Sequence, residues 1–427
     1  MIEKLKTAAL TLLVLLSLLQ SYLLAYSYPK YDPVKPEEYV KTDILGTHAS
    51  LKDMLFPDQL VLHLGNQQHT VLYPNTVKYN EVMEILKQRF LEGFRKTSVT
   101  SLGYNWDDVR NKQQGVEIRF RDGLPMNVLQ EVMQLKGDLQ GENDLITRIL
   151  IFAKDTNEVR AILFTDTANT VYEAIKADFT VKDIEKFVQT DESFTPYKAM
   201  TGDYYLPMKP LTIPSFKMTY TQFTADQLKR TFFVDPTLTR NVTERDGSEI
   251  YTDGKRGLKL RNEQHWMTYT DPVAATENNK VDLRESLLSA VQFINQHGGW
   301  NGKYGVQKVP QRLLPGSQQY VFRQYYDSYP VINTRNENTG FMKISLQKGI
   351  VASYDRSLLT PDLRSAVRTE VQLAGGEQLE QKLAAFAKKA RVYTIFPAYR
   401  MVVTEQAMIL VPAWVAELQD GTYEFLD

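Results

Sequence analysis

The sequence contains no cysteine. This absence excludes disulfide bonds, thiol nucleophiles, cysteine-ligated zinc and iron–sulfur clusters. An excess of charge of either sign is also missing, because 50 Lys and Arg residues face 51 Asp and Glu residues, for a formal net charge of -1. Nucleic-acid binders and basic membrane-surface proteins depend on excess positive charge, so this balance argues against both classes.

Histidine is scarce, with five residues scattered along the chain. Only His63 and His69 could approach each other, across a turn at Gly65 and Asn66. Two ligands make a weak metal site, so we expect these histidines to be solvated or hydrogen-bonded in loops. The sequence therefore predicts no metal and no cofactor.

Enzyme motifs are present only in the wrong context. The tetrad from Ser345 to Lys348 matches S-x-x-K but ends a predicted strand, whereas that chemistry needs the serine at a helix start. The glycine-rich residues 298–303 follow a helix, whereas a phosphate loop follows a strand. The pair Asp107 and Asp108 suits a helix N-terminus. We therefore predict that the protein is not an enzyme and has no catalytic residues.

A long apolar run begins close to the N-terminus. Residues 7–29 contain no Asp, Glu, Lys or Arg, and a helix of this length extends ~34 Å, enough for a hydrocarbon core of ~30 Å. Lys4 and Lys6 precede the run, which predicts a short cytoplasmic N-terminus and an extracytoplasmic remainder. We expect an uncleaved, single-pass anchor in the cell membrane. A cleaved signal peptide is the alternative, although its apolar region is usually ~7–15 residues long.

One stripe of this N-terminal helix carries the candidate contact residues. Thr7, Leu10, Val14, Ser17, Ser21 and Leu24 recur at heptad-like spacing, and Gln20 lies beside them. The amide of Gln20 is costly in lipid unless it finds a partner. The candidate contact residues are Val14, Ser17, Gln20, Ser21 and Leu24. We predict that these residues contact another transmembrane helix. The alternative is that the serine and glutamine side chains bond to their own backbone or lie near the membrane interface.

The chain after the apolar run predicts an α+β fold with several domains, in which antiparallel sheets are each packed with helices. Residues 59–64 and 115–121 are expected to form strands, and residues 77–92 an amphipathic helix. Two apolar segments, 145–153 and 159–165, flank a polar loop and indicate a hairpin. The 24 tyrosines fall mostly in later strands, where we expect packing roles.

Proline marks two boundaries. Residues 29–36 read as a stiff, extended stalk, and three prolines within residues 206–214 mark the best domain boundary. Beyond it, each unit begins with a helix and continues as a strand meander. The predicted domains are a cytoplasmic tail and transmembrane anchor (1–29), an N-terminal α+β ectodomain (30–205), a central helix-plus-meander domain (206–278) and a C-terminal α+β domain (279–427).

Five segments, together with the leucine-rich span and the stalk, carry a resemblance to a known family. They are FPDQLVLH at 56–63, HWMTYTDP at 265–272, AVQFINQHGGW at 290–300, YYDSYPV at 325–331 and LVPAW at 410–414. On these segments the chain resembles the YycH family over its whole length. These are segments that build a fold, and no catalytic motif is among them.

The resemblance implies an accessory regulator of the essential YycG (WalK) sensor histidine kinase, which belongs to a cell-wall-related two-component system of low-GC Gram-positive bacteria. It also implies a single-span partner like YycI, whose ectodomain resembles the later part of this family, and kinase contact largely through transmembrane helices. The alternative is an extracytoplasmic ligand-binding or cell-wall-sensing module without direct kinase contact. That role would require a concave, aromatic-lined pocket.

Overall fold

The computed structural model describes residues 2–26 and 46–426, apart from residues 140, 142–143, 190–193, 202, 273–281, 309–316, 334–337 and 348. It divides into two compact units, Met1–Lys41 and Thr42–Asp427. The predicted stalk at residues 29–36 lies outside the described residues.

The first unit contributes one described element, the helix α1 (Ile2–Tyr26). Its large apolar side chains between Leu10 and Leu19 are 47–65 % exposed. Among the residues that the structure describes, no helix combines the length and the apolar character needed to cross a membrane.

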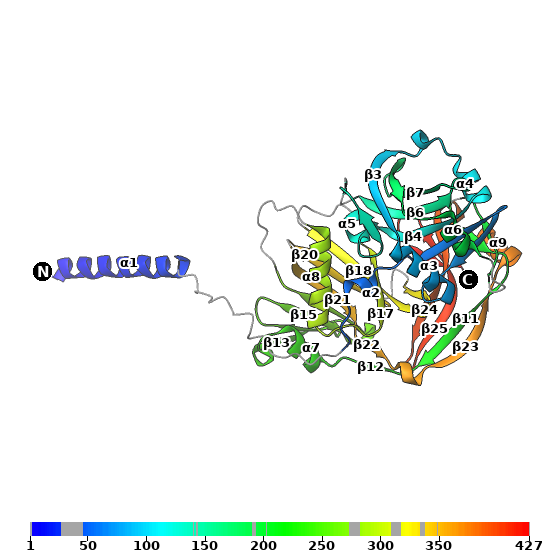
Figure 1. Ribbon diagram of the computed structural model, residues 1–427. Coiled ribbons are helices and arrows are strands. Elements are labelled where there is room, and N and C mark those ends of the chain that lie inside the picture. Colours follow the sequence, from blue (N-terminus) through cyan, green and yellow to red (C-terminus); the bar gives the residue numbers. More distant parts are fainter. Residues whose placement is uncertain are drawn as a thin grey trace. The chain divides into compact units, whose positions relative to one another are not determined.

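The second unit contains a ten-stranded sheet that positions the candidate site (Figure 1). Its strands are β1 (Gln59–Gly65), β2 (Gln68–Leu72), β3 (Phe90–Ser98), β4 (Gln114–Pro125), β5 (Gln134–Lys136), β6 (Leu145–Ala153), β7 (Val159–Thr165), β8 (Thr170–Ala177), β9 (Tyr197–Ala199) and β10 (Tyr205–Pro207). They lie in the order β10-β9-β2-β1-β4-β6-β7-β8-β3-β5. Only β3 and β5 pair in parallel within this described sheet.

A larger sheet of 14 described strands follows in the chain. Its strands are β11 (Leu211–Met218), β13 (Arg240–Thr243), β14 (Glu249–Thr252), β15 (Gly257–Arg261), β16 (Trp266–Thr270), β17 (Lys303–Lys308), β18 (Ser317–Tyr326), β19 (Tyr329–Ile332), β20 (Phe341–Gln347), β21 (Ile350–Ser357), β23 (Val367–Leu373), β24 (Val392–Val403), β25 (Met408–Leu418) and β26 (Tyr423–Phe425). Their order is β13-β14-β15-β16-β21-β20-β18-β19-β24-β25-β11-β23, with β17 beside β18 and β26 beside β25. Strands β19 and β24 pair in parallel, and β12 (Tyr220–Gln222) with β22 (Leu359–Pro361) forms a separate pair.

Helices pack onto these sheets, so the α+β class is confirmed. In the second unit the described α-helices are α2 (Leu51–Met54), α3 (Val77–Gln88), α4 (Trp106–Lys112), α5 (Met126–Leu129), α6 (Val181–Val188), α7 (Ala225–Phe232), α8 (Leu283–Gln296) and α9 (Gly376–Ala385). The apolar stripe of α8 is buried against β18, β20 and β21 (Figure 1). The chain turns away after it at Gly298 and Gly299, whose φ values of 97° and 66° suit glycine.

Two local predictions had different outcomes. The hairpin is confirmed, because β6 and β7 pair in antiparallel fashion with the expected bounds. The helix predicted over residues 77–92 is wrong at its end, because α3 stops at Gln88 and β3 begins at Phe90. Pairing of β3 with β8 on one side and β5 on the other determines this boundary, and helical spacing along the sequence does not report such long-range pairing.

Of the three prolines near residue 210, two lie in strands and Pro210 lies in the short link between them. Pro207 ends β10, and Pro214 lies within β11. The chain passes from the first sheet to the second between these residues, inside the segment predicted as a domain boundary. The domain bounds themselves stay predictions.

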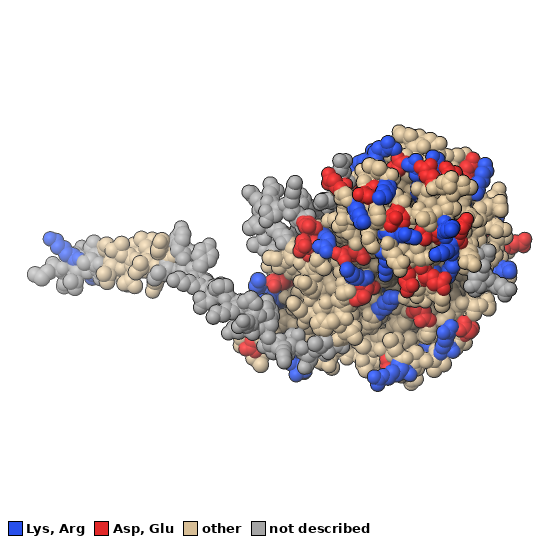
Figure 2. Space-filling model, viewed as in Figure 1, with Lys and Arg blue, Asp and Glu red and all other residues tan. Residues whose placement is uncertain are grey.

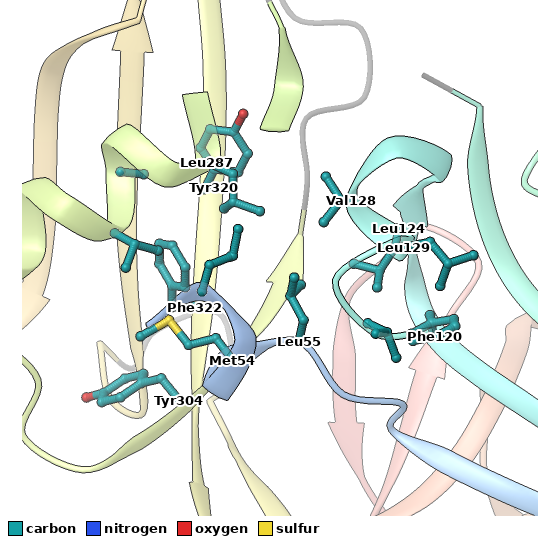
Figure 3. Close-up of a cluster of buried hydrophobic side chains, with 14 of the residues drawn as sticks. Met54, Leu55, Phe120, Leu124, Val128, Leu129, Leu287, Tyr304, Tyr320 and Phe322 are labelled. Carbon is teal, nitrogen blue, oxygen red and sulfur yellow. The ribbon is translucent and has the colours of Figure 1, made fainter. Parts of the chain in front are cut away.

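One hydrophobic core joins the two sheets (Figure 3). Leu55, next to α2, lies between Phe120 of β4 and Phe322 of β18, and all three are buried. Four tyrosines are among the largest fully buried side chains, which agrees with their expected packing role; they are Tyr172, Tyr320, Tyr354 and Tyr399. On the face shown in Figure 2, acidic and basic side chains are intermingled, in agreement with the charge balance of the sequence.

Candidate functional site

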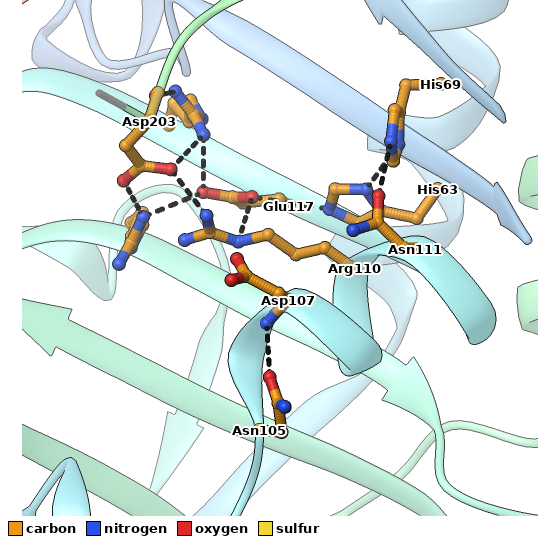
Figure 4. A network of polar contacts seen from close by, with 10 residues as sticks. His63, His69, Asn105, Asp107, Arg110, Asn111, Glu117 and Asp203 are labelled. Carbon is orange, nitrogen blue, oxygen red and sulfur yellow. Dashed lines mark hydrogen bonds and ion pairs between the residues drawn. The ribbon is translucent and has the colours of Figure 1, made fainter. Parts of the chain in front are cut away.

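A buried chain of polar contacts crosses strands β2, β1 and β4 (Figure 4). His63 Nδ1 on β1 lies 3.1 Å from His69 Nδ1 on β2. His63 Nε2 lies 3.3 Å from Glu117 Oε2 on β4, and His69 Nε2 lies 3.2 Å from Asn111 Oδ1 on α4. The histidines are hydrogen-bonded as expected, but the predicted loop location is wrong. They lie within paired strands and are only 1 % and 2 % exposed, because α4 and Tyr205 pack beside them.

The two imidazole rings are neutral at pH 7. Burial lowers the pKa of His63, and burial together with the neighbouring ring lowers the pKa of His69 to about 4. One arrangement of protons satisfies every contact: His63 Nε2 donates to Glu117, His69 Nδ1 donates to His63 Nδ1, and a half-turn of the Asn111 amide presents its NH2 to His69. All four ring nitrogens thus have a hydrogen-bond partner. We call this chain of contacts, from Asn111 through His69 and His63 to Glu117, the relay. Among the described residues, no group of three or more His, Asp or Glu side chains is arranged so that it could hold a metal ion.

Glu117 joins this relay to three arginines. Its Oε1 lies 2.9 Å from Arg119 Nη2 and 3.5 Å from Arg148 Nη1, and its Oε2 lies 3.9 Å from Arg110 Nε. Burial alone would raise the pKa of Glu117, but Arg119, the hydrogen bond to His63 and the other two arginines hold it well below its usual range. Glu117 is therefore a buried carboxylate at neutral pH.

Asp203 contacts the same three guanidinium groups, from the loop between β9 and β10. Its Oδ1 lies 2.8 Å from Arg110 Nη1 and 3.2 Å from Arg119 Nη2, and its Oδ2 contacts Arg148 Nη1. Arg119 Nη1 also donates to the backbone carbonyl of Asp203 at 2.6 Å. The φ of Asp203 is 68°, a left-handed conformation that is uncommon for a residue other than glycine.

These groups form the floor of a cleft of about 520 Å³. Trp106 and Phe164 form one wall, with ring centroids 5.1 Å apart. Tyr393 and Phe396 of β24 contribute a wall from the second sheet. The guanidinium of Arg148 lies 4.1 Å from the Phe164 ring centroid. The described residues thus contain a concave, partly aromatic pocket of the kind that a ligand-binding role requires.

The stripe predicted as a helix contact lies on α1. Val14 is 52 % exposed, and Ser17, Gln20 and Ser21 are exposed as well. The side chain of Leu24 lies outside the described residues. Nothing in the structure tests a contact with another helix, so this contact stays a prediction.

The acidic pair at the start of α4 behaves as predicted. The side chain of Asn105 accepts a hydrogen bond from the backbone N–H of Asp107 at 3.2 Å (Figure 4) and another from that of Asp108 at 3.3 Å. Both carboxylates lie in the first helical turn, where the helix dipole favours negative charge. The arginine cluster, by contrast, escaped the sequence analysis. Its one local signal is the charged face of β4, where Glu117 and Arg119 alternate with apolar residues.

The neutral histidines make stability depend on pH. A folded-state pKa below the unfolded value of ~6.5 means that the stabilisation is complete above ~6.5 and is lost as the pH falls, for His69 down to about 4. In this window, we expect protonation of His69 to lower the free energy of unfolding by about 1.4 kcal/mol per pH unit. Urea unfolding across the window should show a weaker pH dependence for His69→Gln than for wild type. The exposed His48 provides the control, and His48→Gln should retain the wild-type slope. Equal slopes for all three proteins would contradict the expectation.

Comparison with known proteins identifies the family. Models of the N-terminal and C-terminal domains of the YycH protein match residues 3–194 and 201–425. The two-component system WalR/WalK regulatory protein YycH of Bacillus subtilis (strain 168) is 20% identical over 439 residues, which cover 97% of this chain and 94% of that protein. The crystal structure of YycH from Bacillus subtilis matches with a TM-score of 0.71 at 17% identity, over 90% of this chain and 99% of that one. The similarity expected from the five sequence segments is therefore confirmed, and the chain belongs to the YycH family.

Proposed function

We propose that the chain regulates the sensor kinase of a WalR/WalK-type two-component system. The observation that carries the proposal is the similarity to the regulatory protein YycH, which extends over 97% of this chain and 94% of that protein.

In this proposal α1 anchors the chain in the cell membrane by a single pass. Lys4 and Lys6 lie on the cytoplasmic side, and the second unit lies outside the cell. Support comes from the sequence, because residues 7–29 carry no acidic or basic side chain. The exposed apolar side chains of α1 also need a nonaqueous partner.

The contact with the kinase, and with a YycI-like single-span partner, is proposed to run through one face of α1. Val14, Ser17, Gln20, Ser21 and Leu24 form this face. A helix can bias a two-state kinase only by the difference between its contact energies with the two states. At ~0.6 kcal/mol per interhelical hydrogen bond, several contacts must act together.

We expect the triple variant Ser17→Leu, Gln20→Leu, Ser21→Leu to weaken helix association by about 20-fold, which is ~1.8 kcal/mol for three lost hydrogen bonds. A bacterial two-hybrid assay with the kinase, alongside a reporter for its response regulator, measures the loss. Leu15 and Leu19 lie on the opposite side of α1, so Leu15→Ile with Leu19→Ile is the matched control. If the triple variant associates and regulates like the control, the proposed face is wrong.

The cleft favours a second candidate, an extracytoplasmic ligand-binding or cell-wall-sensing module without direct kinase contact. Replacing α1 with an unrelated membrane span distinguishes the two. Loss of kinase regulation would support the contact through α1. Normal regulation would show that the second unit acts without that helix.

A further inference from the structure

We propose that the floor of the cleft, formed by Arg110, Arg119 and Arg148, is a binding site for the carboxylate of a small organic anion, and that Asp203 is a built-in occupant which this anion displaces. The inference does not depend on kinase regulation. It concerns what the second unit binds, and it can fail while the proposed function holds.

Three arginines converge on the carboxylate of Asp203. Its carboxylate contacts three guanidinium groups, through Oδ1 to Arg110 and Arg119 and through Oδ2 to Arg148. Guanidinium groups converging on both oxygens are how proteins recognise a carboxylate. The position is thus already shaped for a carboxylate.

The three arginines are more deeply buried than Asp203, which occupies the site between them. The arginine side chains are only 14–20 % exposed, whereas that of Asp203 is 42 % exposed. The arginines are therefore fixed in the floor, and the occupant reaches them from the solvent side. Asp203 also sits on a loop with a left-handed φ, a conformation that costs free energy for a residue other than glycine.

The floor of the cleft carries a net positive charge. Three arginines face two carboxylates, Glu117 and Asp203, which leaves one positive charge while Asp203 is in place and two once it has left. The other lining charges add little, because Arg121 pairs with Asp58 and Asp166 lies exposed at the rim. An incoming carboxylate would replace the negative charge that the arginines lose when Asp203 leaves.

The walls define the rest of the ligand. Trp106, Phe164 and Phe396 present aromatic surface beside the arginines, in a cleft of about 520 Å³. That volume suits a small molecule and not a protein surface. The ligand class is therefore a small organic anion with one carboxylate and an adjoining apolar group, as in a short peptide with an apolar C-terminal residue.

The first test uses acetate as the probe and the full chain. Asp203→Ala should bind acetate about tenfold more tightly than wild type, since no internal carboxylate competes for the arginines. Thermal unfolding of Asp203→Ala should accordingly show a larger stabilisation by acetate than by chloride of equal ionic strength. The matched control is Asp226→Ala, because Asp226 is an exposed aspartate paired with Lys229 at 2.7 Å. Equal stabilisation of the two variants by acetate overturns the proposal.

The second test measures binding to the wild-type chain, so it does not require Asp203→Ala to fold. The chain has four tryptophans, and Trp106 lines the cleft, whereas Trp266, Trp300 and Trp414 are buried elsewhere. N-acetyl-L-phenylalanine should shift the indole N–H resonance of Trp106, assigned with Trp106→Phe, and leave the other three in place. N-acetyl-L-phenylalanine amide, which lacks the carboxylate, should not shift it. An equal response to acid and amide, or no response to either, overturns the proposal.

Discussion

Replacing Glu117 with glutamine should lower the free energy of unfolding by about 3–5 kcal/mol, because it removes one partner from a buried ion cluster. Glu117 pairs with Arg119 and Arg148 of the sheet and with Arg110 of α4, and it accepts a hydrogen bond from His63. Glutamine has nearly the same volume, so the loss would come from charge and hydrogen bonding and not from a cavity. Urea denaturation of the full chain measures the change.

A surface ion pair provides the control for this experiment. Glu370 lies 2.9 Å from Arg368, and its side chain is 51 % exposed. Solvent screens such a pair, so Glu370→Gln should cost only about 0–1 kcal/mol. If Glu117→Gln costs no more than this control, the buried ion cluster does not stabilise the fold as argued.

Replacing Trp300 with alanine should cost about 3–5 kcal/mol, because a large aromatic side chain leaves a cavity in the core. Trp300 is 1 % exposed and packs against Phe322 and Tyr304, with ring centroids 5.1 and 5.3 Å away. Its Nε1 donates to Asn295 Oδ1 at 2.8 Å. Thermal or urea unfolding measures the change.

Phenylalanine separates the two contributions of this side chain. Trp300→Phe retains most of the aromatic packing but loses the hydrogen bond to Asn295, so it should cost clearly less than the alanine variant. The backbone of Trp300 also pairs with Thr47, in two hydrogen bonds of 2.9 Å, which tie the first described residues of the second unit to its core. Equal losses for the alanine and phenylalanine variants would contradict the packing argument.

Local pattern was enough to predict elements that the sequence defines on both sides. The hairpin of β6 and β7 and the strand β1 each follow from apolar segments bounded by polar or glycine residues. The end of α3 could not be predicted in this way, because pairing of β3 within the sheet determines it. Whether a segment forms a helix or a strand could thus be predicted where residues close along the chain determine it.

The candidate site depended on contacts that no local pattern reports. Arg110, Glu117, Arg148 and Asp203 come from a helix, two strands and a loop up to 93 positions apart in the sequence, and only the strand order brings them together. The buried location of His63 was missed for the same reason, because α4 covers the strand from another part of the chain. The family resemblance could be recognised from the sequence alone, since each segment that carries it is continuous along the chain.

The most direct test of the central claim, that this chain regulates a WalK-type kinase, is the phosphorylated fraction of the cognate response regulator in cells with and without the chain. We expect that deletion changes this fraction, that the full chain restores it, and that the triple α1 variant restores it less completely than the Leu15→Ile, Leu19→Ile control. An unchanged phosphorylated fraction after deletion would contradict the account.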